Sequence, residues 1–165
     1  DADASAEPFN YGLRTPWKTM FGGAFIIPKY GFISADAEWT DYSASHFNLT
    51  RSVNDEANRA YGQELNSAIQ RNYKTAVSYR FGAEAVLDIF RIRGGYNLLG
   101  KAAKNADGFN TAWSIGGGVR FDKAYIDLAF RRSDSVGSVS PYSGAPTAST
   151  ESKVNDIMMT VGFKF

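Results

Sequence analysis

Charged side chains that could bind a ligand occur at alternate positions within several apolar stretches of this sequence. The basic members are Arg14, Lys18, Lys74, Arg80, Arg91, Arg93, Arg120, Arg131 and Lys164, and the acidic members are Asp36, Glu38, Glu84 and Asp127. A period of two places such residues on one face of a β-sheet. Their basic excess could attract the carboxylate headgroup of an acidic ligand. Alternatively, the arginines and carboxylates interlock and hold the sheet rigid. Our candidates for contact with a ligand or a lumen are Arg80, Glu84, Arg91, Arg93, Arg120 and Arg131.

Catalytic chemistry finds little support in the sequence. The single histidine, His46, has Asp41, Ser43 and Ser45 nearby, but both serines fall on the face opposite His46 if the strand is regular. A serine nucleophile needs its base and orienting acid to converge in space. With no cysteine and one histidine, a zinc site is also unsupported. The sequence therefore predicts neither an enzyme, nor a cofactor, nor a metal site.

The segments that must position the charged residues have the pattern of β-strands. Seven runs alternate apolar with polar or charged residues, over residues 13–27, 33–42, 73–85, 90–98, 109–121, 124–131 and 157–165. These runs are 8 to 15 residues long, whereas strands of globular proteins average about 5 to 6. We therefore expect an all-β chain in which one sheet face is apolar and the other is charged.

Two all-β architectures compete for this pattern. A soluble sandwich also has alternating strands, but strands this long, with charge on one face and aromatic ends, would leave its core full of Arg, Asp and Glu. In a transmembrane barrel, ten residues tilted by about 40° rise about 25 Å, the height of the apolar band. Aromatic residues near strand ends, such as Trp17, Trp39 and Tyr96, fit the interfacial girdles. We expect a transmembrane antiparallel β-barrel in the bacterial outer membrane, in contact with lipid.

Composition removes other classes. No run approaches the roughly 18 apolar residues of a transmembrane helix. The net charge of +1, from 18 basic and 17 acidic residues, gives no reason to expect a nucleic-acid partner.

The connections between the runs alternate between short and long, as between the two sides of an outer-membrane barrel. The long ones are expected to be extracellular and cover residues 48–72, 100–108 and 134–153. Within 48–72, Ala57, Tyr61, Leu65 and Ile69 recur with helical spacing, and Ser52 or Asn54 can cap that short helix. Residues 134–153, rich in Gly, Pro and Ser, are expected to form a surface loop.

The final run ends in Phe163 and Phe165, and a terminal aromatic residue resembles the signal for insertion of outer-membrane barrels. If that end is periplasmic, counting back through seven strands places residues 1–12 outside the cell, as the remnant of an extracellular loop. Outer-membrane barrels begin in the periplasm and have an even number of strands. We therefore expect the whole chain, residues 1–165, to be the C-terminal half of one barrel, completed by an N-terminal half in a second chain.

Several motifs together resemble the C-terminal half of the FadL/TodX family of outer-membrane long-chain fatty acid transporters, especially its Bacteroidetes branch. They begin with Tyr11-Gly-Leu-Arg-Thr-Pro-Trp-Lys18, Lys29-Tyr-Gly-Phe-Ile-Ser-Ala-Asp-Ala-Glu38 and Asp41-Tyr-Ser43, and continue with Val77-Ser-Tyr-Arg-Phe-Gly-Ala-Glu84, Arg93-Gly-Gly-Tyr96, Gly116-Gly-Gly-Val-Arg-Phe121, Tyr125-Ile-Asp-Leu-Ala129 and Thr160-Val-Gly-Phe-Lys-Phe165. The resemblance implies half of a fourteen-stranded barrel and passage of fatty acids or other hydrophobic compounds. The family's N-terminal hatch and the strand with its lateral opening have no counterpart here.

Two functions follow as expectations. The first is an outer-membrane channel for hydrophobic small molecules, such as long-chain fatty acids, that is completed by the missing segment. The second is a structural or docking barrel subunit of a larger outer-membrane complex, in which partner proteins would cover residues 48–72 and 134–153.

Overall fold

The computed structural model describes residues 11–48, 56–139, 142 and 145–163. The strands are β1 (Gly12–Arg14), β2 (Lys18–Ile27), β3 (Gly31–Asp41), β4 (His46–Asn48), β5 (Thr75–Leu87), β6 (Phe90–Gly100), β7 (Phe109–Arg120), β8 (Ala124–Val139) and β9 (Ala148–Phe163), and they are joined by the 3₁₀-helix η1 (Tyr42–Ala44) and the α-helix α1 (Glu56–Asn72). The chain divides into two compact units. One holds most of the large sheet, and the other holds β1, β4, η1 and α1.

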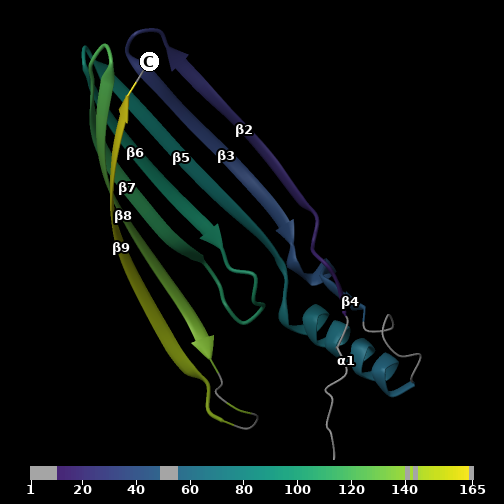
Figure 1. Cartoon of the computed structure of the whole chain (residues 1–165). Helices are drawn as coiled ribbons and strands as arrows, with labels where there is room; N and C mark the ends of the chain where they lie inside the picture. Colours follow the sequence, from purple (N-terminus) through teal and green to yellow (C-terminus); the bar gives the residue numbers. More distant parts are fainter. Residues whose placement is uncertain (1–10, 49–55, 140–141, 143–144, 164–165) are drawn as a thin grey trace, which may run out of the picture. The chain divides into compact units, whose positions relative to one another are not determined.

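The large sheet has seven antiparallel strands in the order β2-β3-β5-β6-β7-β8-β9 (Figure 1). This confirms the expectation of an all-β chain with a seven-stranded antiparallel sheet. Neighbours in the sheet also follow one another in the sequence, apart from the small strand β4, so the sheet is a meander. Within the described residues, β2 and β9 are its two edge strands.

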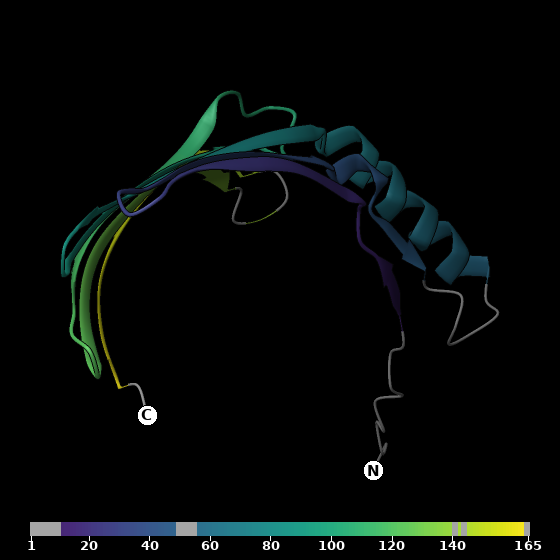
Figure 2. The ribbon, with the colours of Figure 1, turned by 90° about the horizontal axis from the view of Figure 1, so that it is seen from above.

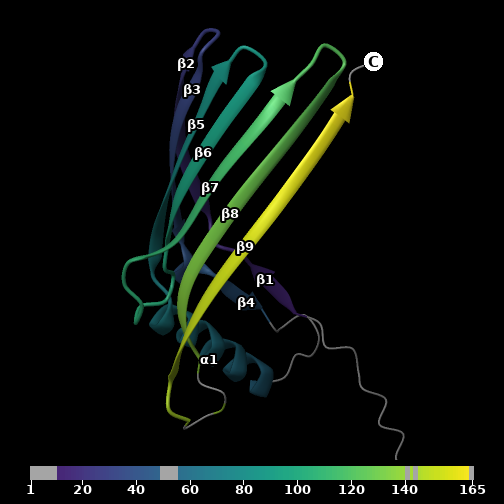
Figure 3. The same cartoon turned by 90° about the vertical axis from the view of Figure 1, so that its left-hand side faces the viewer.

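Short turns join the strands at one end of this sheet, as the alternating connection lengths predict. The turns after β2, β5 and β7 lie at the same end as Phe163, the last residue of β9 (Figure 3). At the turn after β2, Lys29 adopts a positive φ of 74°, and Gly31 follows with a φ of 136°. A Cβ on Gly31 would overlap the carbonyl of Glu84, so glycine allows β3 to begin close against β5.

The first predicted run, 13–27, is wrong as a single strand. The structure divides it into β1, which pairs with β4, and β2, which begins at Lys18 and pairs with β3. Residues 15–17 between them are not in a strand, and Pro16 lies among them. Proline lacks the N–H that a sheet ladder needs, so it ends the pairing there.

The predicted surface loop over residues 134–153 is also wrong, because most of it is strand. β8 and β9 are each 16 residues long, and their ladder continues from Asp134 opposite Lys153 to Val139 opposite Ala148 (Figure 3). Threonine and valine in this hairpin favour strands, although polar and apolar residues do not alternate there. Of the predicted turn residues, Pro141 and Gly144 lie outside the described residues.

The smaller unit confirms a helix within residues 48–72, although its 17 residues make it longer than a short helix. Asn66 on α1 fastens the helix to β4. Its side-chain oxygen accepts a hydrogen bond from the backbone N of Phe47 at 2.7 Å, and its Nδ2 donates to the Phe47 carbonyl at 2.8 Å. The amide side chain therefore pairs with β4 as a neighbouring strand would. The proposed caps, Ser52 and Asn54, lie outside the described residues, as do residues 1–10 of the expected loop remnant.

The large sheet is curved across its strands, as Figure 2 shows in a view from above. The described part of the chain includes no helix with the length and apolarity of a membrane span.

Candidate functional site

The two faces of the large sheet differ in chemistry. In the register of β5 to β9, charged residues share one face of the sheet and large apolar residues share the other. The charged face carries Asp36, Glu38, Arg80, Glu84, Arg91, Arg93, Arg120, Asp127 and Arg131. The apolar face carries Phe81, Ile92, Tyr96, Trp113, Ile115, Leu128, Phe130, Ile157 and Met159.

Burial on these faces is the reverse of that in a water-soluble sheet. On the apolar face, Phe81 is 48% exposed and Ile92 is 49% exposed. On the charged face, the side chain of Glu84 is only 16% exposed and that of Arg91 is 25% exposed. The only buried hydrophobic residues in the described chain are Ala76 and Ala112. The charges therefore cover one another, and the large apolar side chains face outward.

One cluster on the charged face joins β3 to β5. The guanidinium of Arg80 donates from Nη1 to Asp36 Oδ1 at 3.0 Å and from Nη2 to Glu38 Oε2 at 2.8 Å. Glu38 is 7% exposed, so this carboxylate is among the few buried polar groups of the described residues. A buried carboxylate needs a partner of opposite charge, and Arg80 is that partner.

A second cluster spans β5 to β8. Arg93 Nε on β6 donates to Glu84 Oε2 on β5, and Arg93 Nη1 lies 3.2 Å from Asp127 Oδ1 on β8. Arg120 on β7 reaches the same carboxylate, with Nη2 2.9 Å from Asp127 Oδ2. Arg91 stands at the margin, its Nε 4.0 Å from Glu84 Oε1. Asp127 is thus shared by two guanidinium groups.

The bridge from Arg93 to Asp127 passes over β7 because two glycines there have no side chain. Gly116 lies opposite Arg93, and Gly118 lies opposite Asp127. A Cβ on Gly118 would overlap the carboxylate of Asp127. The glycines of β7 therefore leave room for an ion pair between β6 and β8, which are not neighbours in the sheet.

Glycines also indicate the direction of curvature. On the charged face, a Cβ on Gly82 would lie 2.9 Å from Ser34 Oγ, and one on Gly95 would lie 2.9 Å from Ser114 Oγ. On the apolar face, a Cβ on Gly23 would meet nothing within 4 Å, and one on Gly117 would come no closer than 3.9 Å. Bending a sheet crowds side chains on its concave face, so the charged face is the concave one.

The structure brings five of the six predicted ligand or lumen residues into these clusters. Arg80 joins the first cluster, and Glu84, Arg91, Arg93 and Arg120 join the second. Arg131 lies apart: its register partners are Ser114 and Asp156, and no ion pair within the described residues includes it.

Charge balance in the two clusters differs from the basic excess that the sequence suggested. The first cluster has one arginine and two carboxylates, and the second has three arginines and two carboxylates, so that together four arginines face four carboxylates. This balance favours the interlocked arrangement over an anion site at these residues.

Tyr125 is a member of the charged face to which the sequence pattern assigned no role. The guanidinium of Arg120 lies 4.7 Å from its ring centroid, a cation–π distance. The same ring covers Gly162 on β9, where a Cβ would overlap it. Tyr125 therefore connects the last strand to the second cluster. Only the register, which the sequence pattern does not provide, identifies this contact.

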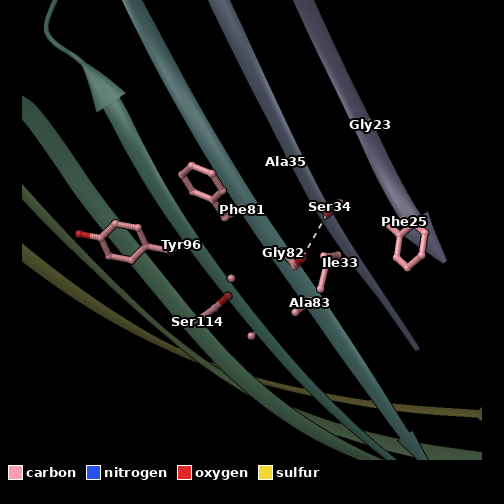
Figure 4. Close-up of a pocket in the computed structure, with 12 residues that line it drawn as sticks. Gly23, Phe25, Ile33, Ser34, Ala35, Phe81, Gly82, Ala83, Tyr96 and Ser114 are labelled. Carbon is pink, nitrogen blue, oxygen red and sulfur yellow. Dashed lines mark hydrogen bonds between the residues drawn. The ribbon is translucent and has the colours of Figure 1, made fainter. Parts of the chain in front are cut away.

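The apolar face contains a shallow groove of about 680 Å³ (Figure 4). Its floor is made of small residues on neighbouring strands, among them Gly23, Ala35, Ala83 and Gly94, and the rings of Phe25, Phe81 and Tyr96 rise beside it. The ring of Trp113 further along this face packs on Phe130, with centroids 5.3 Å apart. Small and large apolar residues thus alternate across the strands.

Residues with catalytic potential do not converge in the described chain. The Ser43 hydroxyl donates to Asp41 Oδ1 at 2.6 Å, and the same carboxylate accepts from the Ser43 backbone N and so caps η1. The ring of His46 instead lies next to Asn66, 3.5 Å from its Nδ2. The described residues also include no group of three or more His, Cys, Asp or Glu that could hold a metal ion. Of the predicted insertion signal, Phe163 ends β9 and is 68% exposed, and Phe165 lies outside the described residues.

Comparison with protein-family models, curated proteins and solved structures found no match to this chain.

Proposed function

We propose that this chain forms part of the wall of a β-barrel channel in a bacterial outer membrane, through which hydrophobic small molecules such as long-chain fatty acids pass. The observation that carries the proposal is the inverted burial of the large sheet. Burying apolar area is favourable by about 25 cal/mol per Å², so a sheet that exposes an entire apolar face to water is unfavourable. Lipid removes that cost, because a hydrocarbon environment solvates the outward side chains.

The concave charged face suits the inner side of such a wall. Polar interiors and apolar exteriors alternate along the strands of outer-membrane barrels. The ion pairs around Arg80 and Arg93 hold neighbouring strands together, and the described residues bury only Ala76 and Ala112 as a hydrophobic core. Closure of the sheet into a barrel is part of the proposal.

The apolar character of the cargo rests on the resemblance of the sequence motifs to the FadL/TodX transporters. Growth on a fatty acid tests it. The intact gene product, expressed in a Gram-negative host that lacks its own long-chain fatty acid transporter, is expected to restore growth on oleate. Growth on acetate controls for general fitness. A folded protein in the outer membrane that leaves growth on oleate unrestored would contradict the channel.

Arg93→Gln separates two roles of the second cluster. If Arg93 only braces the wall, the variant loses the folded, heat-resistant species seen in unheated gels, and transport falls with it. If Arg93 also attracts the acidic headgroup, the folded species persists while oleate uptake declines. We expect the first result, because Arg93 is already engaged by two carboxylates.

A docking barrel within a larger complex is the second candidate, and the β8–β9 hairpin favours it. Beyond Arg132, both faces of this hairpin are mostly polar apart from Val136, Val139 and Val154, and its ladder continues to Val139. A strand extension of this kind offers a rigid polar surface to a partner protein. Slower hydrogen exchange at the backbone amides of Asp134 and Lys153 in native membranes than in the purified protein would support docking.

A further inference from the structure

A long segment of each edge strand of the large sheet carries no charge. β2 has no charged residue after Lys18, and β9 has none from Ile157 to Phe163. Each of the five inner strands places at least one charged side chain on the charged face, namely Asp36 on β3, Arg80 on β5, Arg93 on β6, Arg120 on β7 and Asp127 on β8.

Both edges are also apolar on the charged side of the sheet. On β2, Met20 and Ile26 lie on the side of Gly22, whose Cβ would meet that of Asp36, and they are 54% and 70% exposed. On β9, Met158 lies opposite Ala129 on the charged face and is 53% exposed. The edge strands therefore expose apolar side chains on both faces, whereas the inner strands expose large apolar side chains on the charged face only at Phe32 and Val139.

Natural sheets protect free edges with charged residues, proline or short strands, because an unpaired ladder recruits other strands. β2 after Lys18 and β9 from Ile157 to Phe163 have the opposite composition, which is that of strands with neighbours on both sides. In lipid, each unpaired backbone group costs several kcal/mol, so these edges could not stay open there.

Strand direction limits what can pair with the edges. Because seven strands alternate in direction, β2 and β9 run the same way. Pairing β2 with β9, within one chain or between two copies inserted in the same orientation, would therefore be parallel. Antiparallel pairing at both edges requires a segment with an odd number of strands.

We propose that β2 and β9 both pair, antiparallel, with one further β-sheet segment that has an odd number of strands and is not a second copy of this chain. The strands of that segment next to β2 and β9 are apolar on both faces near Met20, Ile26 and Met158. They bring no counter-charge, since the arginines and carboxylates of the two clusters already balance. This inference rests on the proposed place of the chain in a membrane barrel, and it specifies the partner.

Site-specific photocrosslinking tests the pairing. Benzoylphenylalanine replaces one native phenylalanine at a time in the intact gene product, in the membranes of cells that express it: Phe21 or Phe25 on β2, or Phe163 on β9. The three side chains are 73%, 67% and 68% exposed, so the larger ring fits without repacking. Phe81 on the inner strand β5, which is 48% exposed, is the matched control. Mass spectrometry locates the crosslinked residues.

The expected result has three parts. Phe21 and Phe25 crosslink to one strand outside residues 11–163, in reversed order along it. Phe163 crosslinks to another strand of the same segment, and Phe81 crosslinks only to neighbouring strands of this chain. An unchanged mass of the crosslinked product assigns the segment to the same polypeptide, and an increased mass assigns it to a second one, and either supports the proposal.

Crosslinks between two copies of this chain would overturn the proposed pairing. So would crosslinks from Phe21 and Phe25 that follow the same order along the partner strand, or crosslinking yields at the edge positions no higher than the yield at Phe81. Carbonate extraction of the same membranes keeps this test separate from the proposed function. Edge pairing in protein that carbonate releases would contradict the membrane barrel and leave the pairing intact. Membrane-embedded protein without edge crosslinks would contradict the pairing and leave the membrane barrel intact.

Discussion

The same seven strands have two faces that are held together in different ways. On the charged face, arginines and carboxylates interlock, and glycines give them room. On the apolar face, large side chains such as Phe81 and Leu128 point outward with little to cover them. The side chains of the charged face pair with one another. The large side chains of the apolar face have no such partners and need an apolar environment around them. The difference teaches that this sheet is organised around its polar side.

A charge on the apolar face should have the largest effect. Leu128→Arg places a guanidinium at an apolar position of β8 that is 56% exposed. If that face contacts lipid, the variant should lose about 2 to 4 kcal/mol of stability in lipid vesicles. Urea titration of the heat-resistant species in unheated gels measures it. Ser135→Arg, in the polar extension of β8, is the matched control and should be nearly silent. Equal effects would remove the distinction between the faces.

Adding one methyl group to neighbouring glycines of β7 separates the faces more finely. Gly118→Ala places a Cβ against Asp127 and should cost about 1 to 3 kcal/mol through overpacking. Gly117→Ala points to the other face, where its Cβ would lie 3.9 Å from the Arg91 carbonyl, and should change stability little. Urea unfolding in the same vesicles compares them. Two equally destabilised variants would contradict the crowding of the charged face.

Removing the shared carboxylate comes next. Asp127→Asn leaves Arg93 and Arg120 without the charge that they share, and should cost about 1 to 2 kcal/mol. We expect less than the loss of a fully buried pair because the side chain of Arg93 is 44% exposed. The unfolding free energy should also depend less on salt than that of the parent protein. An unchanged midpoint and salt dependence would show that the second cluster contributes nothing.

The smallest effect is expected at the edge of the apolar face. Asp134→Asn breaks the pair with Arg132, whose Nε lies 3.2 Å from Asp134 Oδ1 in a hairpin where both side chains are more than a third exposed. Exposed pairs contribute less than about 1 kcal/mol. The variant should therefore unfold close to the parent midpoint, and a larger loss than for Asp127→Asn would reverse the order of the two sites.

Alternation in the sequence was sufficient to predict the inner strands, because each must place opposite chemistry on its two faces. It failed where one face alone does not decide the structure. The β8–β9 extension mixes polar residues and valines on both sides without alternation, so its serines and glycine resembled a loop. Pro16 interrupted a pattern that otherwise continued. The alternation also could not predict which side chains contact one another. Period two assigns Arg93 and Asp127 to one face, but only the register shows that Gly116 and Gly118 let them meet across β7. Asn66 gave no periodic signal at all.

Contact of the apolar face with lipid is the central claim, and the absence of cysteine from the sequence makes it directly measurable. Single cysteines at Leu128 and Arg131 of β8, each carrying an environment-sensitive fluorophore, probe the two faces of one strand in vesicles. Quenchers attached to lipid acyl chains should act on the label at position 128, and a water-soluble quencher should act on the label at position 131. Equal quenching at both positions by either reagent, or the reverse pattern, would contradict the account.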